Sequence, residues 1–400
     1  MEAPHAPDND NFLEVPVSNL KPGMYVAELD RPWLDTPFAM QGFYVGDEVD
    51  IQYIARYCSY VYVDPRAKTV AAGHSRKQLS VREQVEFKDE FQRAQVDFES
   101  ASETMSRVFQ QLGANGQVDV VAVQEVITPL IDSVFRNREA LAVLVRLKDK
   151  ADYFYSHSLS TAVWAAVLGR HLGLDKRSLI DIATGAAVMD VGMTTLGDEL
   201  LSAPNPLTAE QVKQMRKHVV ASLKILKRSG DMPNPVLNIV ACHHERLDGS
   251  GYPRGLAGND IPVFARIVGL ADTYDAMIST RPYSRARSSF EAMQELQDLK
   301  DQLFQGSLVE HFVQTVGMFP TGSIVELNTG DVGVVVQQNP TRRLRPKVVL
   351  ILRADKAPRN DLAVIDLAKY QNGKAGEPTV WITAELETGA HGIQPDDYFI

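Results

Sequence analysis

Residues 243–256 read HHERLDGSGYPRGL and directly follow the apolar run VLNIVAC at 236–242. Apolar residues recur in this run with helical spacing, and His243 and His244 come three and four residues after Val240. Both imidazoles therefore extend the buried stripe of a predicted helix at its end. The closely spaced glycines and serine after Asp248 favour a tight turn whose backbone approaches a ligand.

Five predicted helical segments each place a histidine or an aspartate on or beside an apolar face. The residues are His157, Asp190, His218, His243, His244 and Asp272. An ionisable group in an apolar interior costs roughly several kcal/mol unless it is paired or binds a metal. A single histidine in such a place is more often a satisfied core residue than a ligand, but six residues on five segments favour a metal centre. Mixed imidazole and carboxylate ligands suit iron, manganese or zinc, and a bridging aspartate suits a two-metal site.

The loop text, followed by ADTYDAM at 271–277 and RPYSRAR at 281–287, resembles the HD-GYP family of cyclic-di-GMP phosphodiesterases. This family is a branch of the HD metal-dependent phosphohydrolases, and the resemblance covers roughly residues 125–315. The matching residues are His243, His244, Glu245, Asp248, Gly249, Gly251, Tyr252, Pro253, Arg266, Asp272, Arg281, Pro282 and Tyr283. The stretches LKPGMYVAELDRPW and YVYVDP near the N-terminus resemble the accessory domain that often precedes HD-GYP domains.

The resemblance implies a role for each of the six residues. Asp190 matches the aspartate of the HD pair, which bridges two metals, and Asp190 and Asp272 are the implied catalytic residues. One metal site would comprise His218, His243, His244 and Asp190, and the other His157, Asp272 and Asp190. The resemblance also implies a substrate site, formed by Asp248, Gly249, Gly251, Tyr252, Pro253, Arg266 and Arg281.

Three positions depart from the family pattern. Met189 stands where the histidine of the HD pair belongs, and Met193 replaces a lysine that faces the substrate phosphate. Tyr153 stands where three-metal members have glutamate, so no third metal is expected. A thioether is a poor ligand for iron(II) or manganese(II), so we expect one well-formed divalent-metal site and one weakened site.

Two functions follow from this pattern. The first is a metal-dependent phosphodiesterase that hydrolyses cyclic-di-GMP to a linear dinucleotide or GMP, with activity weakened by the substituted HD histidine. The alternative is a catalytically degenerate domain that binds cyclic-di-GMP, or another signalling protein, without cleavage. The predicted helices at 83–112 are compatible with a homodimer and equally with packing inside one chain.

Composition limits the remaining possibilities. The net charge of −10 argues against a general DNA or RNA binder, which needs a basic surface. No stretch reaches the ~18 apolar residues of a membrane span, and the two cysteines, Cys58 and Cys242, are interpreted as reduced thiols of a cytoplasmic protein.

The sequence predicts a mainly α fold: an HD-type helical domain flanked by a small β-rich N-terminal module and a small C-terminal β element. Period-two patterns mark both β parts, with a turn at 328–331 in the C-terminal one. Helical spacing marks the middle, where Thr208 and Gln211 have the capping-box pattern of a helix start. The predicted boundaries are a disordered leader at 1–11, the β-rich module at 12–65, a linker and helices at 66–122, the helical domain at 123–319, and the C-terminal β element and tail at 320–400.

Overall fold

The computed structural model describes residues 12–31, 43–45, 48–65, 84–147, 153–201, 207–279, 286–339, 342, 344–370 and 379–398. The predicted leader at 1–11 lies outside these residues. The chain divides into two compact units, an N-terminal one and a larger one that holds the helices and the C-terminal sheet. None of the helices in the described ranges is both long and apolar enough to cross a lipid bilayer.

The N-terminal unit is a small antiparallel sheet with one helix. Its elements are β1 (Leu13–Pro16), β2 (Tyr25–Leu29), β3 (Phe43–Tyr44), α1 (Glu48–Ile54) and β4 (Tyr60–Val63), and the strand order is β1-β4-β2-β3. Val26, Leu29, Ile54 and Val61 form its core together with Cys58. Burial and the nearby Asp30 raise the pKa of the Cys58 thiol to about 12, which leaves it protonated, as a packing residue.

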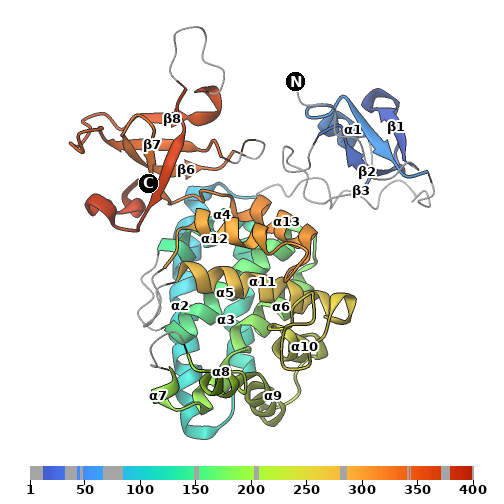
Figure 1. Ribbon diagram of the computed structural model, residues 1–400, viewed down its shortest axis with the longest axis vertical. Helices are drawn as coiled ribbons and strands as arrows, with labels where there is room; N and C mark the ends of the chain where they lie inside the picture. The colour runs from blue at the N-terminus through green and yellow to red at the C-terminus, as the bar shows by residue number, and fades with distance from the viewer. Residues whose placement is uncertain are drawn as a thin grey trace. The chain divides into compact units, whose positions relative to one another are not determined.

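The larger unit is predominantly helical (Figure 1). Its helices are α2 (Phe87–Asn115), α3 (Val120–Arg136), α4 (Arg138–Leu147), α5 (Tyr153–His171), α6 (Lys176–Val188), η3 (Val191–Thr195), α7 (Asp198–Leu201), α8 (Ala209–Met215), α9 (His218–Ser229), α10 (Asn234–Cys242), α11 (Val263–Ile278), α12 (Ser289–Asp298) and α13 (Gly306–Val316). The predicted capping box at Thr208 and Gln211 is present at the start of α8. The predicted boundary between residues 122 and 123 falls inside α3.

Aromatic side chains form the centre of the helical core. Trp164 of α5, Tyr274 of α11 and Phe312 of α13 are fully buried, and their rings meet edge to face with centroids 5.4 and 5.0 Å apart. Such contacts contribute about 0.5–1.5 kcal/mol each beyond the area they bury. They fix α5 against α11, the two helices that carry His157 and Asp272.

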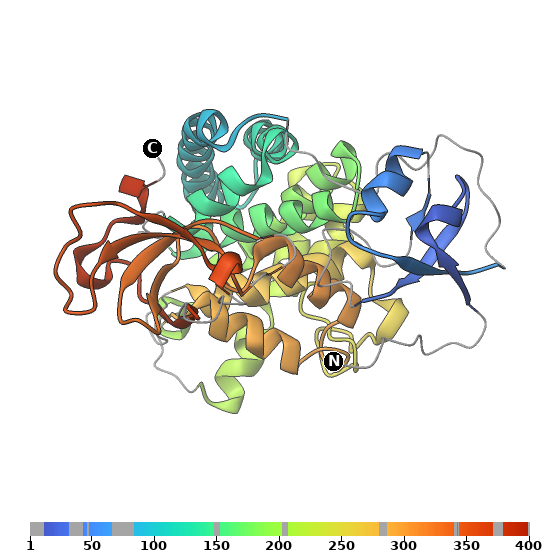
Figure 2. The ribbon, with the colours of Figure 1, turned by 90° about the horizontal axis from the view of Figure 1, so that it is seen from above.

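The C-terminal sheet confirms the predicted return to strands. Its strands are β5 (Ile324–Leu327), β6 (Val332–Gln337), β7 (Lys347–Leu352), β8 (Val364–Asp366) and β9 (Ile382–Leu386), in the order β8-β7-β6-β5-β9, and Figure 2 shows the sheet in orange and red. The predicted turn joins β5 to β6, with Gly330 in the left-handed region at φ +83°. Glu385 of β9 pairs with Arg146 of α4 at 3.2 Å and accepts the Phe290 N–H at 2.9 Å. These bonds tie the sheet to the helices.

Candidate metal centre

The six residues predicted as metal ligands lie together and form two overlapping groups. One group is Asp190, His218, His243 and His244, and the other is His157, Asp190 and Asp272. Within each group the possible ligand atoms lie within 4.8 Å of one another. Asp190 belongs to both groups, so it is the residue that the two groups share.

A glycine allows Asp190 to approach the imidazoles. The Gly192 N–H donates to Ser222 Oγ at 2.8 Å, and a Cβ at position 192 would lie only 2.2 Å from the carbonyl oxygen of His218. Any larger residue would push α9 away from the end of α6. With glycine there, Asp190 Oδ1 lies 3.2 Å from His218 Nε2 and 3.6 Å from His243 Nε2.

Backbone carbonyls orient two of the histidines. His218 Nδ1 donates to the Met215 carbonyl at 2.7 Å, and His243 Nδ1 donates to the Val240 carbonyl at 3.0 Å. A carbonyl can only accept, so Nδ1 carries a proton in both rings and Nε2 is the ring atom that faces the centre. Within the described part of the chain, both Nε2 atoms and Asp190 Oδ1 are buried without a hydrogen-bond partner. An unpaired buried polar atom costs about 1–3 kcal/mol, and a bound metal ion would satisfy all three.

A buried carboxylate orients the third histidine. His157 Nε2 lies 2.9 Å from Asp272 Oδ1, and its Nδ1 lies 2.7 Å from Asp275 Oδ2. Asp275 is fully buried and also accepts from Trp164 Nε1 at 3.2 Å and from the Ser279 hydroxyl at 3.2 Å. Asp275 shares a helix face with Asp272, and this spacing alone is compatible with supporting a ligand or with simple helix packing. Its contacts show that it supports His157, in the way carboxylates support metal-binding histidines.

The protonation states of Asp190 and His244 suit metal binding, whereas His157 would have to release its Nε2 proton to bind a metal. Burial alone would raise the pKa of Asp190, but the nearby imidazoles of His218 and His243 hold that pKa well below the ordinary carboxyl value. Burial, followed by the charge of His243, lowers the pKa of His244 well below that of a free imidazole. Burial also opposes charge on His157, yet its two carboxylate partners outweigh burial and raise its pKa to about 9. Asp190 is thus an anion and His244 a neutral ring, the forms that bind a metal.

The glycine-rich loop packs tightly beside the histidine pair. A Cβ at Gly251 would lie 2.4 Å from the Arg246 nitrogen and 2.5 Å from the Glu245 Cα, so no other residue fits. The buried Glu245 carboxylate accepts the backbone N–H groups of Arg254 at 2.8 Å and Leu256 at 2.9 Å. This bracing role of Glu245 was not predicted, although an acidic residue directly after two interior histidines is a signal for it.

Two of the predicted substrate residues, Tyr252 and Pro253, lie at the tip of this loop. The Tyr252 ring centroid lies 4.6 Å from that of His244 and 6.3 Å from that of His218. Pro253 is exposed. Tyr252 therefore borders the metal centre.

Asp248 and Gly249 form the turn itself. Asp248 is exposed, and its Oδ1 accepts from the Ser250 N–H at 2.9 Å and the Ser250 hydroxyl at 2.6 Å. Gly249 has φ +81°, a conformation that favours glycine. The Asp248 side chain thus stabilises the loop from its solvent side.

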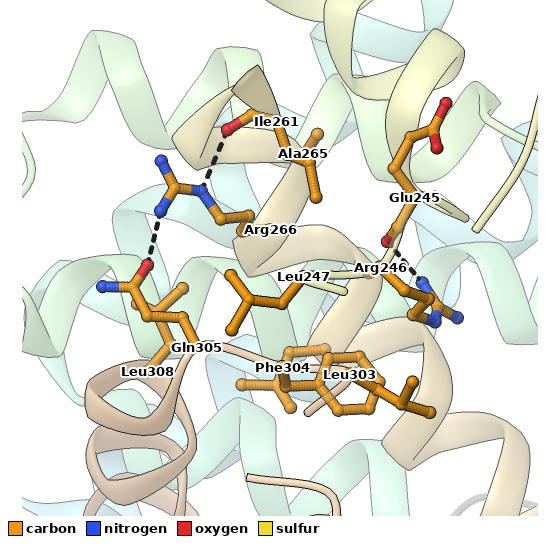
Figure 3. Close-up of a pocket in the computed structure, with 12 residues that line it drawn as sticks. Glu245, Arg246, Leu247, Ile261, Ala265, Arg266, Leu303, Phe304, Gln305 and Leu308 are labelled. Carbon is orange, nitrogen blue, oxygen red and sulfur yellow. Dashed lines mark hydrogen bonds between the residues drawn. The ribbon is translucent and has the colours of Figure 1, made fainter. Parts of the chain in front are cut away.

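Arg266 lies in a separate pocket (Figure 3). Its Nε–H donates to the Ile261 carbonyl at 2.9 Å, and its Nη1–H donates to Gln305 Oε1 at 2.6 Å. None of the six candidate ligands lines this pocket. These contacts join the start of α11 to the start of α13. Arg281, the other predicted substrate arginine, lies outside the described residues.

Of the three departures from the family pattern, Met189 is found at an interior position. Met189 is 0% exposed and directly precedes Asp190, so a thioether occupies the interior position of the missing imidazole. Met193 is partly buried on η3. The side chain of Tyr153 lies outside the described residues. The group of His157, Asp190 and Asp272 therefore has three protein ligands, one fewer than the other group.

The chain matches three family models: a domain of unknown function (DUF3391) at residues 13–123, an HD domain at 143–308, and a KOW domain associated with HD domain at 324–373. It is similar to the cyclic di-GMP phosphodiesterase PA4108 of Pseudomonas aeruginosa, with 28% identity over 91% of this chain and 89% of the relative. It is also similar to a cyclic di-GMP phosphodiesterase of Thermotoga maritima, with 32% identity over 48% of this chain and 52% of the relative.

The chain thus spans most of the Pseudomonas relative and about half of the Thermotoga one. A solved HDGYP protein from Bdellovibrio bacteriovorus aligns with a TM-score of 0.47 and 16% identity, over 75% of this chain and 98% of that one. The HD domain match and the two relatives agree with the motif at 243–256: the chain carries an HD domain at 143–308, preceded by the DUF3391 match, and is similar to cyclic di-GMP phosphodiesterases.

Proposed function

We propose that this protein is a metal-dependent phosphodiesterase that hydrolyses cyclic-di-GMP to a linear dinucleotide or GMP. The observation that carries the proposal is the sharing of Asp190 by two groups of interior ligands. Relatives named cyclic di-GMP phosphodiesterases support the choice of substrate. The whole-length similarity to the Pseudomonas protein supports the same function for the complete chain.

The proposed roles follow from the contacts at the centre. Two divalent ions, when bound, would activate water and neutralise charge on the phosphate. Asp190 would hold both ions, and Asp272 with His157 would complete the second site. Asp275 holds the proton on His157 Nδ1, so Nε2 is the atom that would bind a metal after losing its own proton. Glu245 and the tight packing at Gly251 hold the loop that would cover the substrate.

The two proposed sites differ in strength. Asp190, His218, His243 and His244 supply four protein ligands, a complete set for iron or manganese. The other group has three, because a methionine stands at position 189. We therefore propose one well-formed site and one weakened site, with hydrolysis slower than in a protein with a complete HD pair.

The loop residues Gly249, Gly251, Tyr252 and Pro253 are proposed to shape the substrate site, and Asp190 and Asp272 to act in catalysis. Asp248 and Arg266 make protein contacts that support an indirect role in the same site, and Arg281 is retained as a substrate residue. The proposed location is the cytoplasm. We also propose that the protein forms a homodimer and contacts other signalling proteins. The division of the chain into the five segments given above is proposed as well.

The test is hydrolysis of cyclic-di-GMP by protein purified anaerobically and loaded with iron(II) or manganese(II). We expect linear dinucleotide or GMP as the product, and loss of activity in Asp190→Asn, which removes the shared ligand's charge. Asp231→Asn is the matched control, because the same change there affects an exposed residue that belongs to neither ligand group. Fully loaded protein that leaves cyclic-di-GMP intact after long incubation would contradict the proposal.

A second candidate is a degenerate domain that binds cyclic-di-GMP without cleaving it. The buried Met189 favours it, because two-metal hydrolysis needs both ions and this substitution weakens one site. Calorimetry separates the two candidates. Binding without product supports the second candidate, and a lack of binding to any cyclic dinucleotide excludes it.

A further inference from the structure

Arg216, an arginine at the edge of the candidate metal centre, has no recorded anionic partner among the described residues. The guanidinium carbon of Arg216 lies 4.8 Å from the centroid of the Tyr252 ring, a cation–π contact. The same ring lies 4.6 Å from that of His244. Arg216 is exposed, and among the described residues its side chain has no recorded hydrogen bond or ion pair.

The backbone around Arg216 is fixed at the corner between α8 and α9. The Arg216 N–H donates to the Val212 carbonyl at 3.0 Å, and the Lys217 N–H donates to the Gln214 carbonyl at 3.0 Å. Two residues further on, the His218 ring bonds back to the last residue of α8. The corner is therefore held by the same contacts that orient a candidate ligand, and Arg216 is presented from a rigid element.

Two other arginines near the loop, Arg246 and Arg266, are already engaged. Arg246 donates to the His243 carbonyl and the Glu245 carbonyl, both at 3.0 Å, and its guanidinium also lies over the Phe304 ring. Arg266 donates to a carbonyl and to a glutamine side chain. The guanidinium of Arg216, in contrast, keeps its N–H donors available to a ligand.

The chemistry of the site indicates which ligand. Met193, on the segment that packs against His218 through Gly192, brings no charge. A planar guanidinium can donate two parallel hydrogen bonds to the oxygens of one phosphate. We propose that Arg216, held over Tyr252, binds a non-bridging phosphate oxygen pair of the cyclic dinucleotide and supplies the cation that Met193 lacks. This inference rests on the function proposed above.

The test compares Arg216→Ala, Arg216→Lys and Lys217→Ala in the full-length, metal-loaded protein. Lys217 is the matched control, since it is the adjacent exposed cation and has no ring contact with Tyr252 among the described residues. Cyclic-di-GMP binding is measured by calorimetry, and KM and kcat are measured separately. Metal content and unfolding midpoint are measured on every variant, and we expect them to be unchanged.

Loss of a charge-assisted hydrogen bond predicts Kd and KM values about tenfold or more higher for Arg216→Ala. Arg216→Lys should recover part of this loss, because lysine keeps the charge without the fork. Lys217→Ala should stay within about twofold of the wild type, as expected for an exposed charge. Wild-type protein that binds cyclic-di-GMP no better than Arg216→Ala would overturn the inference alone. Wild-type protein that neither binds nor cleaves any cyclic dinucleotide would overturn the proposed function and this inference with it.

Discussion

Replacing Asp275 with asparagine should weaken one metal site and leave the other intact. The carboxylate accepts from three donors: Oδ2 from His157 and Ser279, and Oδ1 from Trp164. Asparagine has only one accepting oxygen, so its NH2 group must face one of these donors. If it faces His157, the imidazole proton moves to Nε2 and the ring stops being a ligand.

The other orientation of the asparagine leaves the Trp164 N–H buried without an acceptor, at a cost of about 1–3 kcal/mol. Changes to such supporting groups typically lower metal affinity about 10–100-fold. This corresponds to about 1.4–2.7 kcal/mol at the site of His157, Asp190 and Asp272. The imidazoles of His218 and His243 take their orientation from backbone carbonyls, so their site should keep its affinity.

The assay is a competitive titration of manganese(II) against a chromophoric chelator, which resolves the two affinities. Glu90→Gln is the matched control, because Glu90 is equally buried and binds Arg136 through two bonds at 2.7 and 2.8 Å, apart from the candidate ligands. We expect Glu90→Gln to lower the free energy of unfolding without changing either metal affinity. Equal losses at both sites in Asp275→Asn, or none at either, would refute the reasoning.

Three further predictions concern the same centre. Met189→His should raise bound metal toward two ions per chain and increase the rate of cyclic-di-GMP hydrolysis. Elemental analysis and product formation measure these changes. A variant that gains neither would show that Met189 does not weaken the second metal site. Gly251→Ala should destabilise the protein by about 1–3 kcal/mol, because the added Cβ meets backbone atoms at 2.4–2.6 Å; urea unfolding measures this, and a change below ~0.5 kcal/mol would contradict the packing. Removing metal with a chelator should lower the unfolding temperature and restore it on readdition, because only the folded chain assembles the ligands; an unchanged temperature would argue against a bound metal.

Much of the fold could be predicted from local patterns. Period-two stretches such as YVYV at 60–63 became strands, the Thr208 and Gln211 pair became a capping box, and the turn at 328–331 joined two strands. Each of these features depends on residues close in sequence, where alternation, caps and turn preferences act directly.

The ligands of the candidate site could be predicted because burying a polar group is costly, so a polar residue on an apolar face needs an explanation. The six histidines and aspartates stood out because each interrupts an apolar face, and the structure brings all six together. Helix ends were less accessible to sequence reasoning: Asp190 and His243 lie just beyond α6 and α10, where the orphan backbone groups of a helix end allow the chain to turn.

Tertiary contacts account for what the sequence could not reveal. The role of Asp275 depends on Trp164 and His157, more than one hundred positions earlier in the chain, and Arg266 finds its acceptor at Gln305. No local pattern encodes such pairings. The same is true of Arg216, whose importance becomes visible only when Tyr252 lies beneath its guanidinium.

Anomalous X-ray scattering from crystals of the manganese-loaded protein tests the central claim most directly. We predict one strong peak among Asp190, His218, His243 and His244, and a second, weaker peak between Asp190, Asp272 and His157. Crystals soaked in excess manganese that show no peak beside Asp190 would contradict the account.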